Sequence, residues 1–287
     1  MKKVILSFFA MLATLVLSAQ NSGTEGQRLR GGFQPGYQEE IIYEGPDVIF
    51  RQIDEHTWVG NGKVMANESV YLIEGADKAV LIDAGTSIKN LKKIVEGITS
   101  KPVSLYITHV HPDHTGSAVN DFPELWINAA DVVNVPMFMK DYPGKINYLT
   151  DGEIIELGER QLEVVFTPGH TPGSTTYFDK ANRYGFSGDA FGSGNLLLTT
   201  NFSTLWNSCS RVERYMVKHE IEKMYPGHYR GSNPETLQRI RDQKAVAEGM
   251  LDGTIKGETN ANGMLGLNGS VSGNGFRISY NEIMGVK

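Results

Sequence analysis

Short apolar runs bounded by turn-forming residues dominate the chain from residue 41 onward. Their β-branched and aromatic residues are typical of strands that are at least half buried. In the first half of the chain they predict a meander of antiparallel strands at 48–53, 57–59, 69–73 and 79–82. In the second half they predict strands at 152–157, 161–166, 174–178 and 184–187.

Each group of strands is followed by apolar residues at helical spacing. The first stripe consists of Ile88, Leu91, Val95 and Ile98. We expect Thr86 or Ser87 to cap this helix and Pro102 to lie beyond its end. The second stripe consists of Leu205, Cys209, Val212, Met216 and His219. Strands followed by a helix, twice over, predict two sheets that lie between helices.

A third helix is expected near the end of the chain, with Asn233 as its cap and Pro234 at its first position. From about residue 253 the chain is rich in Gly and Asn, and we interpret this part as a tail of unclear role with one strand-like run at 276–280. Residues 41–287 are therefore expected to form a single domain that ends in this tail.

The first residues have the pattern of an export signal. Two lysines precede an apolar stretch at 4–17, and Ala19 is a small residue suited to cleavage. We predict a signal peptide at 1–19, a polar lead-in at 20–40, and an exported protein that is periplasmic or secreted. A membrane anchor is the alternative, but the stretch is short. No stable membrane association is therefore expected after cleavage.

The charge of the chain limits its partners. It has 27 Lys+Arg and 33 Asp+Glu, so loss of the two lysines of the signal peptide leaves 25 minus 33, or −8. An acidic protein without basic runs lacks the surface that binds phosphate backbones. We expect a small-molecule substrate and no nucleic acid, while the oligomeric state is not determined by the sequence. The single cysteine, Cys209, is interpreted as a buried apolar thiol.

One hexapeptide concentrates metal-binding side chains. It follows an apolar, strand-like run at 103–108 and contains His109, His111, Asp113 and His114. Because side chains alternate along a strand, the first two imidazoles should face the same side, and Pro112 then turns the chain away. The last two side chains can face a second point nearby. This arrangement suits two metal ions about 3.5 to 4 Å apart that share a water.

Further donors stand in short turn-rich segments. His170 lies between two Pro-Gly pairs, His228 follows Tyr-Pro-Gly, and Asp189 directly follows a strand-like run. Five of the seven histidines therefore fall in loops of the kind that supply metal ligands. Nitrogen and oxygen donors without a thiolate indicate zinc first, with iron or manganese as alternatives.

Together these motifs resemble those of the metallo-β-lactamase superfamily. The recurrent elements occur in order at 81–85, 109–114, 168–174, 188–189 and 227–228. The resemblance implies an α/β fold, namely a four-layer αββα sandwich of two mixed β-sheets flanked by helices. The match covers most of the expected domain and is much more specific for the superfamily than for a substrate.

The resemblance also implies a ligand set. One metal would be held by His109, His111 and His170, and the other by Asp113, His114 and His228. Asp189 would bridge both metals. Asp83 would orient a ligand from behind, as outer carboxylates commonly do.

Two zinc ions that share a hydroxide would supply a nucleophile near neutral pH, because the pKa of bound water falls from about 15.7 to roughly 7. No serine or cysteine nucleophile is then needed, and Asp113 could act as the catalytic residue that moves a proton. We therefore predict a dinuclear zinc hydrolase that cleaves a carbonyl ester, thioester, lactone or amide bond.

Other activities fit parts of this pattern. A periplasmic β-lactamase is one alternative, although the branches that use a zinc-binding cysteine would have it where Asp189 stands. Acyl-homoserine lactonases carry a tyrosine three residues further on, where this chain has Gly192. A sulfur dioxygenase with one iron ion would be an oxidoreductase. A non-catalytic binding protein would keep the fold without turnover.

The loops offer candidates for substrate contacts. The segment 133–139 is too apolar for a simple solvated loop, and it either lines a cleft or packs into the core. Arg230 could bind a substrate carboxylate with two hydrogen bonds, or lie at the surface. The residues expected to contact the substrate are Phe138, Tyr142, Asn195, Trp206 and Arg230.

Overall fold

The computed structural model describes residues 40–259 and 266–283. The expected signal peptide, and all but one residue of the expected lead-in, lie outside this described part of the chain. None of the described helices combines the length and the apolar composition that crossing a lipid bilayer requires.

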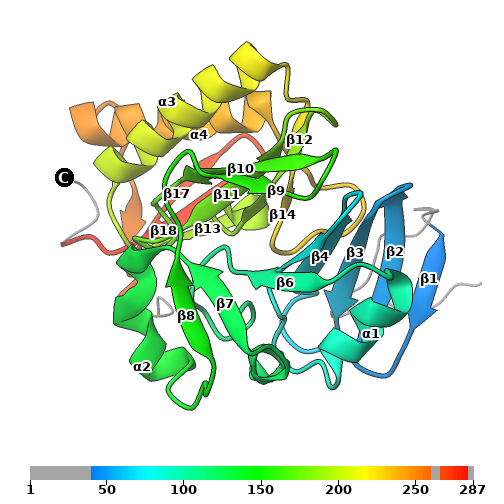
Figure 1. The fold of residues 1–287 in the computed structure, drawn as a ribbon. Coiled ribbons are helices and arrows are strands. Elements are labelled where there is room, and N and C mark those ends of the chain that lie inside the picture. Colours follow the sequence, from blue (N-terminus) through cyan, green and yellow to red (C-terminus); the bar gives the residue numbers. More distant parts are fainter. Residues whose placement is uncertain (1–39, 260–265, 284–287) are drawn as a thin grey trace, which may run out of the picture.

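The first half of the chain forms a mixed eight-stranded sheet whose order in space follows the sequence (Figure 1). Strands β1 to β5 pair antiparallel, as the apolar pattern predicts, and β5 to β8 pair parallel. The strands are β1 (Ile41–Glu44), β2 (Val48–Asp54), β3 (Thr57–Gly62), β4 (Ser69–Glu74), β5 (Ala79–Ile82), β6 (Val103–Tyr106), β7 (Glu124–Ile127) and β8 (Lys145–Tyr148). Parallel neighbours need a crossover, and helix α1 (Leu91–Ile98) lies in the first one.

The second half forms a mixed six-stranded sheet with the order β15-β14-β12-β11-β10-β9. Its strands are β9 (Ile154–Glu156), β10 (Gln161–Phe166), β11 (Thr175–Asp179), β12 (Tyr184–Gly188), β14 (Lys223–Pro226) and β15 (Glu235–Thr236). β12 and β14 pair in parallel, and the other neighbours pair antiparallel. Helices α3 (Phe202–His219) and α4 (Leu237–Asp252) cover the outer face (Figure 1).

Three buried apolar layers join these elements. On β4, Tyr71 and Ile73 belong to the layer between the two sheets, whereas the alternate residues Val70 and Leu72 belong to the layer under α1. The third layer lies beneath α3 and α4. Helix, sheet, sheet and helices therefore form four layers, which confirms the predicted αββα sandwich.

Helix α1 begins later than expected. It starts after Asn90, whose φ is 57°, rather than after Thr86 or Ser87. Those two residues lie in a loop fixed by other contacts: the Thr86 N–H donates to Glu68, and the Thr86 carbonyl accepts from Ser117. The Thr86 carbonyl thus helps to hold the chain that follows the histidine run.

Helix α4 also has a different cap from the predicted one. It begins after Thr236, whose hydroxyl accepts from the N–H of Arg239. Asn233 instead accepts from the N–H of Arg230 and donates to the carbonyl of His228. The expected cap residue therefore stabilises the loop after β14, because its side chain pairs with two backbone groups of that loop instead of with the first turn of the helix.

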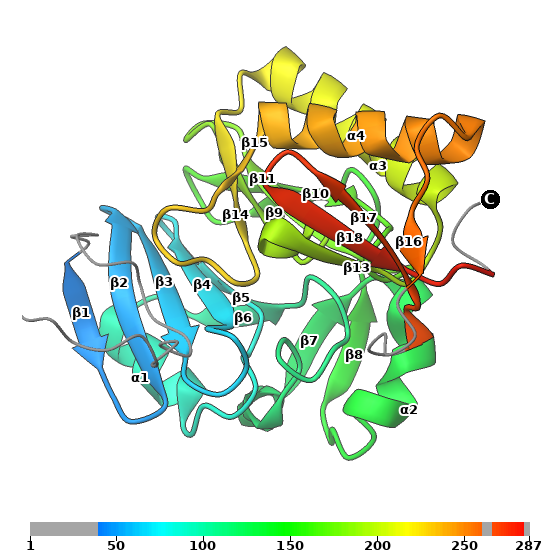
Figure 2. The same ribbon diagram turned by 180° about the vertical axis from the view of Figure 1, so that it is seen from behind.

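The part of the chain from about residue 253, expected to be a Gly- and Asn-rich tail, supplies β16 (Glu258–Thr259), β17 (Gly269–Gly273) and β18 (Phe276–Tyr280) to a third sheet, and β13 (Asn195–Leu198) comes from before α3. The order of the strands in this sheet is β13-β18-β17-β16. Figure 2 shows β17 and β18 beneath α4. Gly269 and Gly273 lie opposite Tyr280 and Phe276, whose rings leave no room for a Cβ. The glycines are therefore required by packing in this sheet.

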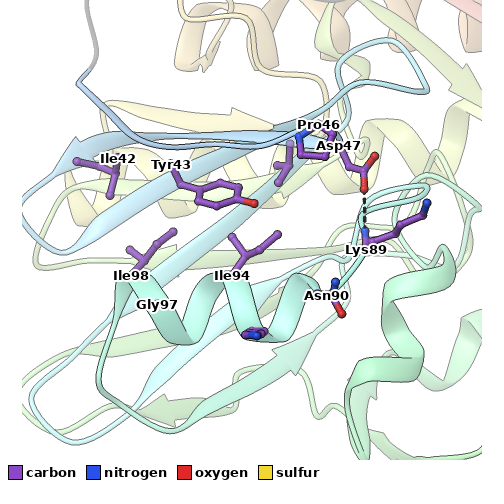
Figure 3. Close-up of a pocket in the computed structure, with 11 residues that line it drawn as sticks. Ile42, Tyr43, Pro46, Asp47, Lys89, Asn90, Ile94, Gly97 and Ile98 are labelled. Atoms are coloured by element: carbon purple, nitrogen blue, oxygen red, sulfur yellow. Dashed lines mark hydrogen bonds between the residues drawn. The ribbon is translucent and has the colours of Figure 1, made fainter.

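Beyond α1, part of the outer face of the first sheet borders a groove of about 530 Å³ (Figure 3). Tyr43 on the strand side and Ile94 on the helix side contribute to its apolar walls. At one end the N–H of Lys89 donates to the carboxylate of Asp47 at 3.2 Å. Helix α1 thus covers the β1 edge of the sheet less completely than its centre.

One buried arginine connects the two large sheets at the edge of the sandwich. Arg160 is 8% exposed, and its Nε donates to Asp179 on β11 at 2.6 Å. Its other donors reach the carbonyls of His56 and Glu74 and the hydroxyls of Thr57 and Tyr184, at 2.8 to 3.0 Å. All five N–H donors of the guanidinium are therefore used.

Replacing Arg160 with Met should lower the free energy of unfolding by about 3 to 5 kcal/mol, because Asp179 would keep a buried charge without its partner. Chemical denaturation measures this loss. Arg241→Met is the matched control, since Arg241 is partly exposed and pairs with Glu213 at the surface. The control should lose at most about 1 kcal/mol. Equal losses in the two variants would contradict the role of Arg160.

Candidate metal centre

Five loops meet at one edge of the sandwich because each follows the carboxyl end of a strand. Asp83 follows β5, residues 109–114 follow β6, His170 follows β10, Asp189 follows β12, and His228 follows β14. β10 and β12 run in the same direction because both pair antiparallel with β11, and β14 is parallel to β12. Side chains that are far apart in the sequence are thereby brought together.

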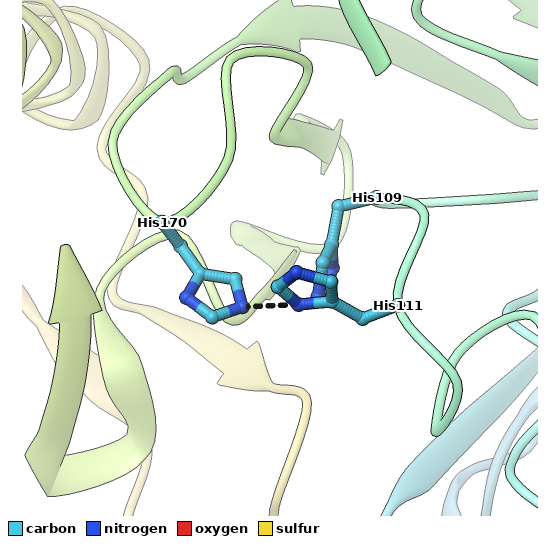
Figure 4. Close-up of side chains that lie close together, drawn as sticks. All are labelled: His109, His111 and His170. Carbon is cyan, nitrogen blue, oxygen red and sulfur yellow. Dashed lines mark hydrogen bonds between the residues drawn. The ribbon is translucent and has the colours of Figure 1, made fainter. Parts of the chain in front are cut away.

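His109, His111 and His170 form one group of possible ligands, which we call the histidine trio (Figure 4). His111 Nδ1 lies 2.9 Å from His170 Nε2, and His109 Nε2 is buried without a hydrogen-bond partner in the protein. The outer nitrogens have other contacts: His170 Nδ1 lies 2.7 Å from the carbonyl of Leu197, and His109 Nδ1 lies 3.1 Å from the hydroxyl of Thr108. These contacts direct the inner nitrogens toward a shared point.

Burial keeps the trio uncharged at neutral pH. It is the largest cause of the lowered pKa values of His109 and His170. Burial, together with the neighbouring His170 and His114 rings, lowers the pKa of His111 to about 4. Neutral imidazole is the form that binds a metal ion, so the trio is ready for one without losing protons.

Asp113, His114, Asp189 and His228 form a second group, the mixed quartet. His228 Nε2 lies 3.4 Å from Asp113 Oδ2 and 3.3 Å from Asp189 Oδ2, and His114 Nε2 lies 3.8 Å from both carboxylates. Burial is the largest single influence and opposes charge on both imidazoles. The nearby carboxylates together outweigh it, raising the pKa of His228 to about 10 and that of His114 well above its usual value. A cation would have to displace these protons.

The carboxylate of Asp189 belongs to the quartet and also lies close to the trio. Its Oδ2 lies 3.8 Å from His170 Nε2 in the trio, and its Oδ1 lies 3.8 Å from His114 Nε2 in the quartet. Gly227 is needed beside it, because a Cβ at that position would collide with Asp189 Oδ1. The aspartate expected to bridge two metals thus lies within reach of both groups.

Asp83 lies behind the quartet. One oxygen accepts from the N–H of Thr108 at 2.7 Å, and the other contacts the Thr108 hydroxyl at 2.8 Å and His114 Nδ1 at 2.7 Å. Its φ of 64° is uncommon for a residue other than glycine. Such strain persists where surrounding contacts determine the conformation, and here the three contacts orient His114.

Asp131 is a supporting residue that the sequence pattern did not reveal. It is fully buried in the 3-10 helix η2 (Ala129–Asn134). Its carboxylate accepts from the N–H of Val110 at 2.8 Å, the hydroxyl of Thr171 at 2.9 Å and the N–H of Gly173 at 2.7 Å. It therefore joins the hexapeptide of histidines to the loop that carries the third histidine of the trio. No local motif signals this role, since all three donors come from other loops.

The two groups fit divalent cations. Within each group the ligand atoms lie within 4.8 Å of one another. His109 Nε2, His114 Nε2 and Asp189 Oδ1 are buried and have no hydrogen-bond partner in the protein. Buried polar atoms without partners are unfavourable, and coordination of a cation would satisfy all three.

Three of the five expected substrate-contacting residues are accessible from outside the core. Phe138, half buried in α2 (Val135–Phe138), places its ring centroid 5.6 Å from that of His111. Asn195 is exposed at the start of β13, and Arg230 is exposed in the loop after β14. Phe138 thus contacts the trio directly, whereas no contact of Asn195 or Arg230 with a ligand is seen among the described residues.

The other two expected contacts pack elsewhere. Tyr142 packs against the layer under α1, and its hydroxyl donates to the carbonyl of Phe122 at 3.1 Å. Trp206 packs against the layer beneath α3 and α4, and the ammonium of Lys244 lies 5.9 Å from the centre of its ring. Both aromatic side chains thus pack against core layers, as Phe138 also does, and contact of Tyr142 and Trp206 with the substrate stays a prediction.

The chain belongs to the metallo-beta-lactamase superfamily, whose family model matches residues 66–228, more than half of the chain. A human acyl-coenzyme A thioesterase is 26% identical over 213 residues, which cover 60% of this chain and 76% of that protein. A probable metallo-hydrolase of Bacillus subtilis is 24% identical over 204 residues, 61% of this chain and 88% of the relative. Hydroxyacylglutathione hydrolase of Nostoc punctiforme is 30% identical over 118 residues, 39% of this chain and 43% of the relative.

Solved structures share the fold. A metallo-beta-lactamase from Pontibacter korlensis matches with a TM-score of 0.57 at 18% identity, covering 70% of this chain and 99% of that one. Another from Erythrobacter litoralis has a TM-score of 0.56 at 19% identity, covering 73% and 99%. At these identities the likeness shows the fold alone. Family membership and the hydrolase relatives make this chain a metal-dependent hydrolase, as the sequence predicts.

Replacing Asp131 with Asn should weaken divalent-cation binding by about 10- to 100-fold, as is typical for residues that support metal ligands. The side-chain amide of Asn would place its own N–H donors against the Val110, Thr171 and Gly173 donors from which the Asp131 carboxylate accepts. Competition with a chromophoric chelator measures the affinity. Asp141→Asn, an exposed change nearby, is the matched control and should have no effect. Equal affinity in both variants would show that Asp131 does not support the trio.

Cation binding at the quartet should release protons and become tighter as pH rises between about 6 and 8. The raised pKa values of His114 and His228 mean that both imidazoles carry protons at neutral pH in the metal-free protein. The trio should add none, because its imidazoles are already neutral. Calorimetric titration with zinc in buffers of different ionisation enthalpy counts the protons. A count of zero at pH 7 would contradict this charge state.

Proposed function

We propose that this chain is an exported hydrolase of acyl thioesters that uses two zinc ions, one at the trio and one at the quartet. The observation that carries the proposal is the position of Asp189, whose Oδ2 lies 3.8 Å from His170 Nε2 of the trio and 3.3 Å from His228 Nε2 of the quartet. Nitrogen and oxygen donors without a thiolate suit zinc. When bound there, zinc supplies Lewis acidity and lowers the pKa of water to near neutrality.

The chain's own residues would orient the reactants and hold a proton. Opposite charges on His114 and His228 overcome the effect of burial and lower the pKa of Asp113 to about 2, so this carboxylate is ionised at neutral pH. Its Oδ2 lies at the edge of the quartet, 3.4 Å from His228 Nε2, where the carboxylate can accept a proton from the attacking water and pass it to the leaving group. Phe138 covers one side of His111 and would exclude water from that side of the reacting bond.

Two relatives support an acyl thioester as the substrate. One is named for acyl-coenzyme A and the other for hydroxyacylglutathione, and both compounds carry an acyl group on a thiol. A thiol has a pKa of about 8.5, so its thiolate leaves with little help from an acid. A thioester therefore suits this site, in which Asp113 is the one residue proposed to transfer a proton.

An apolar face beside the trio would suit the acyl group. Val133 and Met137 are 72% and 74% exposed, although both are apolar. They lie in the same segment as Phe138, and Asp131 connects that segment to the histidine run. Each methylene buried on such a face contributes about 0.8 kcal/mol. A long acyl chain would therefore bind more tightly than an acetyl group.

Export is part of the same proposal. It is supported by residues 1–19, in which lysines, an apolar stretch and a small terminal residue follow the order of a cleavable signal. The hydrolase would then work in the periplasm or outside the cell, where its substrate must also be found.

Removal of metal with a chelator should abolish thioester hydrolysis, because the water activated by zinc would be the nucleophile. Two equivalents of zinc should restore the activity. The assay compares a thioester, an oxygen ester, a lactone and a β-lactam, and elemental analysis of the same sample counts the ions. Within the thioester series KM should fall as the acyl chain lengthens. Turnover after complete metal removal would contradict the zinc mechanism, and faster cleavage of the β-lactam would contradict the substrate.

A further inference from the structure

Glu235 is a buried acidic residue that the proposed mechanism does not use. It lies in β15 opposite Met224 of β14 and is 2% exposed. Its Oε2 has no hydrogen-bond partner in the protein, and burial raises the pKa of the carboxyl to about 8. A buried carboxyl with an unpaired oxygen is unfavourable for stability, and residues of this kind are found where function requires them.

Ser193 connects Glu235 to the metal centre. The backbone N–H of Ser193 lies beside the Glu235 carboxyl and offsets part of the pKa rise that burial causes, and the hydroxyl of Ser193 accepts from the backbone N–H of His228 at 3.2 Å. Ser193 has a φ of 49°, in the left-handed region that serine seldom adopts. The two contacts fix this conformation, and with it the backbone position of His228.

Helix α4 holds the same segment from a second side. Gln243 is fully buried, and its Nε2 donates to the carbonyl of Phe191 at 2.7 Å. The next residue, Gly192, donates its N–H to the carbonyl of Asp189 at 3.0 Å. The short segment between Asp189 and β13 is therefore held by polar side chains from β15 and α4.

His228 depends on this backbone support more than its neighbour in the quartet does. The outer nitrogen of His114 contacts Asp83 at 2.7 Å, which orients the ring directly. The outer nitrogen of His228, Nδ1, is buried and has no hydrogen-bond partner in the protein. The direction of the His228 ring is thus set by its backbone position together with the carboxylates of Asp113 and Asp189, which lie 3.4 and 3.3 Å from Nε2.

We propose that Glu235 is a positioning residue for the mixed quartet: acting through Ser193, its carboxyl sets the positions of His228 and Asp189 and so strengthens cation binding there. The inference rests on the proposed function only in requiring a metal ion at the quartet. It does not depend on the substrate.

Glu235→Leu should weaken zinc binding at the quartet by about 10- to 100-fold and leave binding at the trio unchanged. Chelator competition on the full chain, without substrate, resolves the two affinities. The absorption bands of cobalt bound at the quartet should also shift, because His228 and Asp189 change position. Glu235→Gln keeps an acceptor for the Ser193 N–H and should retain the affinity within about threefold.

Ser193→Ala removes the acceptor for the His228 N–H and should also weaken binding at the quartet. Combined with Glu235→Leu it should add little, because both changes break the same connection. Glu222→Leu, at an exposed position whose partner is Arg183, is the matched control and should bind zinc normally.

Thermal unfolding of the metal-free protein separates positioning from a purely structural role. Glu235→Leu removes a buried carboxyl whose Oε2 has no partner, which offsets the loss of the acceptor for the Ser193 N–H, so the melting temperature should stay close to that of the wild type. Unchanged zinc affinity in this variant, or a loss of affinity that accompanies a lower melting temperature and is equal at both groups, would overturn the inference. A wild-type chain that binds no ion at the quartet would overturn both proposals. A chain that binds zinc as expected but does not cleave thioesters would overturn only the proposed substrate.

Discussion

The collection of five imidazoles and two carboxylates in one largely buried volume is the constraint on which this structure depends. Burial disfavours charge on all of these groups, and the two halves of the site respond differently. In the trio the imidazoles stay neutral. In the quartet, protonated His114 and His228 balance the carboxylates of Asp113 and Asp189. A divalent cation can take the place of those protons, so the protein is arranged around a charge that the cation supplies.

Three buried acids support this arrangement from outside. Asp83 and Asp131 each accept a backbone N–H from a loop that carries a ligand, and the Glu235 carboxyl lies beside the N–H of Ser193 in a segment that adjoins one. A hydrogen bond of this kind typically contributes about 0.5 to 1.5 kcal/mol to stability. The acids therefore stabilise loop conformations that apolar packing alone would leave undetermined. Positive φ values at Asp83 and Ser193 show where the backbone is held in an uncommon conformation.

The fold class and the loops of the site could be predicted because their signals are local. Apolar runs predict strands, and His109 or Asp189 stands in a short motif directly after one. Asp131 could not be found in this way, since its partner Gly173 lies 42 positions further along the chain. The two-metal zinc chemistry, the export and the substrate remain predictions.

Other features of the fold depend on pairings that no local pattern contains. Asn233 has the sequence context of a helix cap, yet its side chain is used by the loop of His228. The third sheet requires β13 to pair with β18, and the glycines of β17 look like a flexible tail until the rings of Phe276 and Tyr280 are placed above them. The ordering of these segments is decided by tertiary contacts rather than by propensity.

The pairing of β13 with β18 bears on how the protein is made. Leu197 in β13 orients the ring of His170 through its carbonyl, and it pairs with Ser279 in β18. During synthesis the amino-terminal sheet and most ligands leave the ribosome well before β18 does. A nascent chain therefore lacks the strand that steadies this ligand, and the centre reaches its final geometry only after translation has passed residue 280.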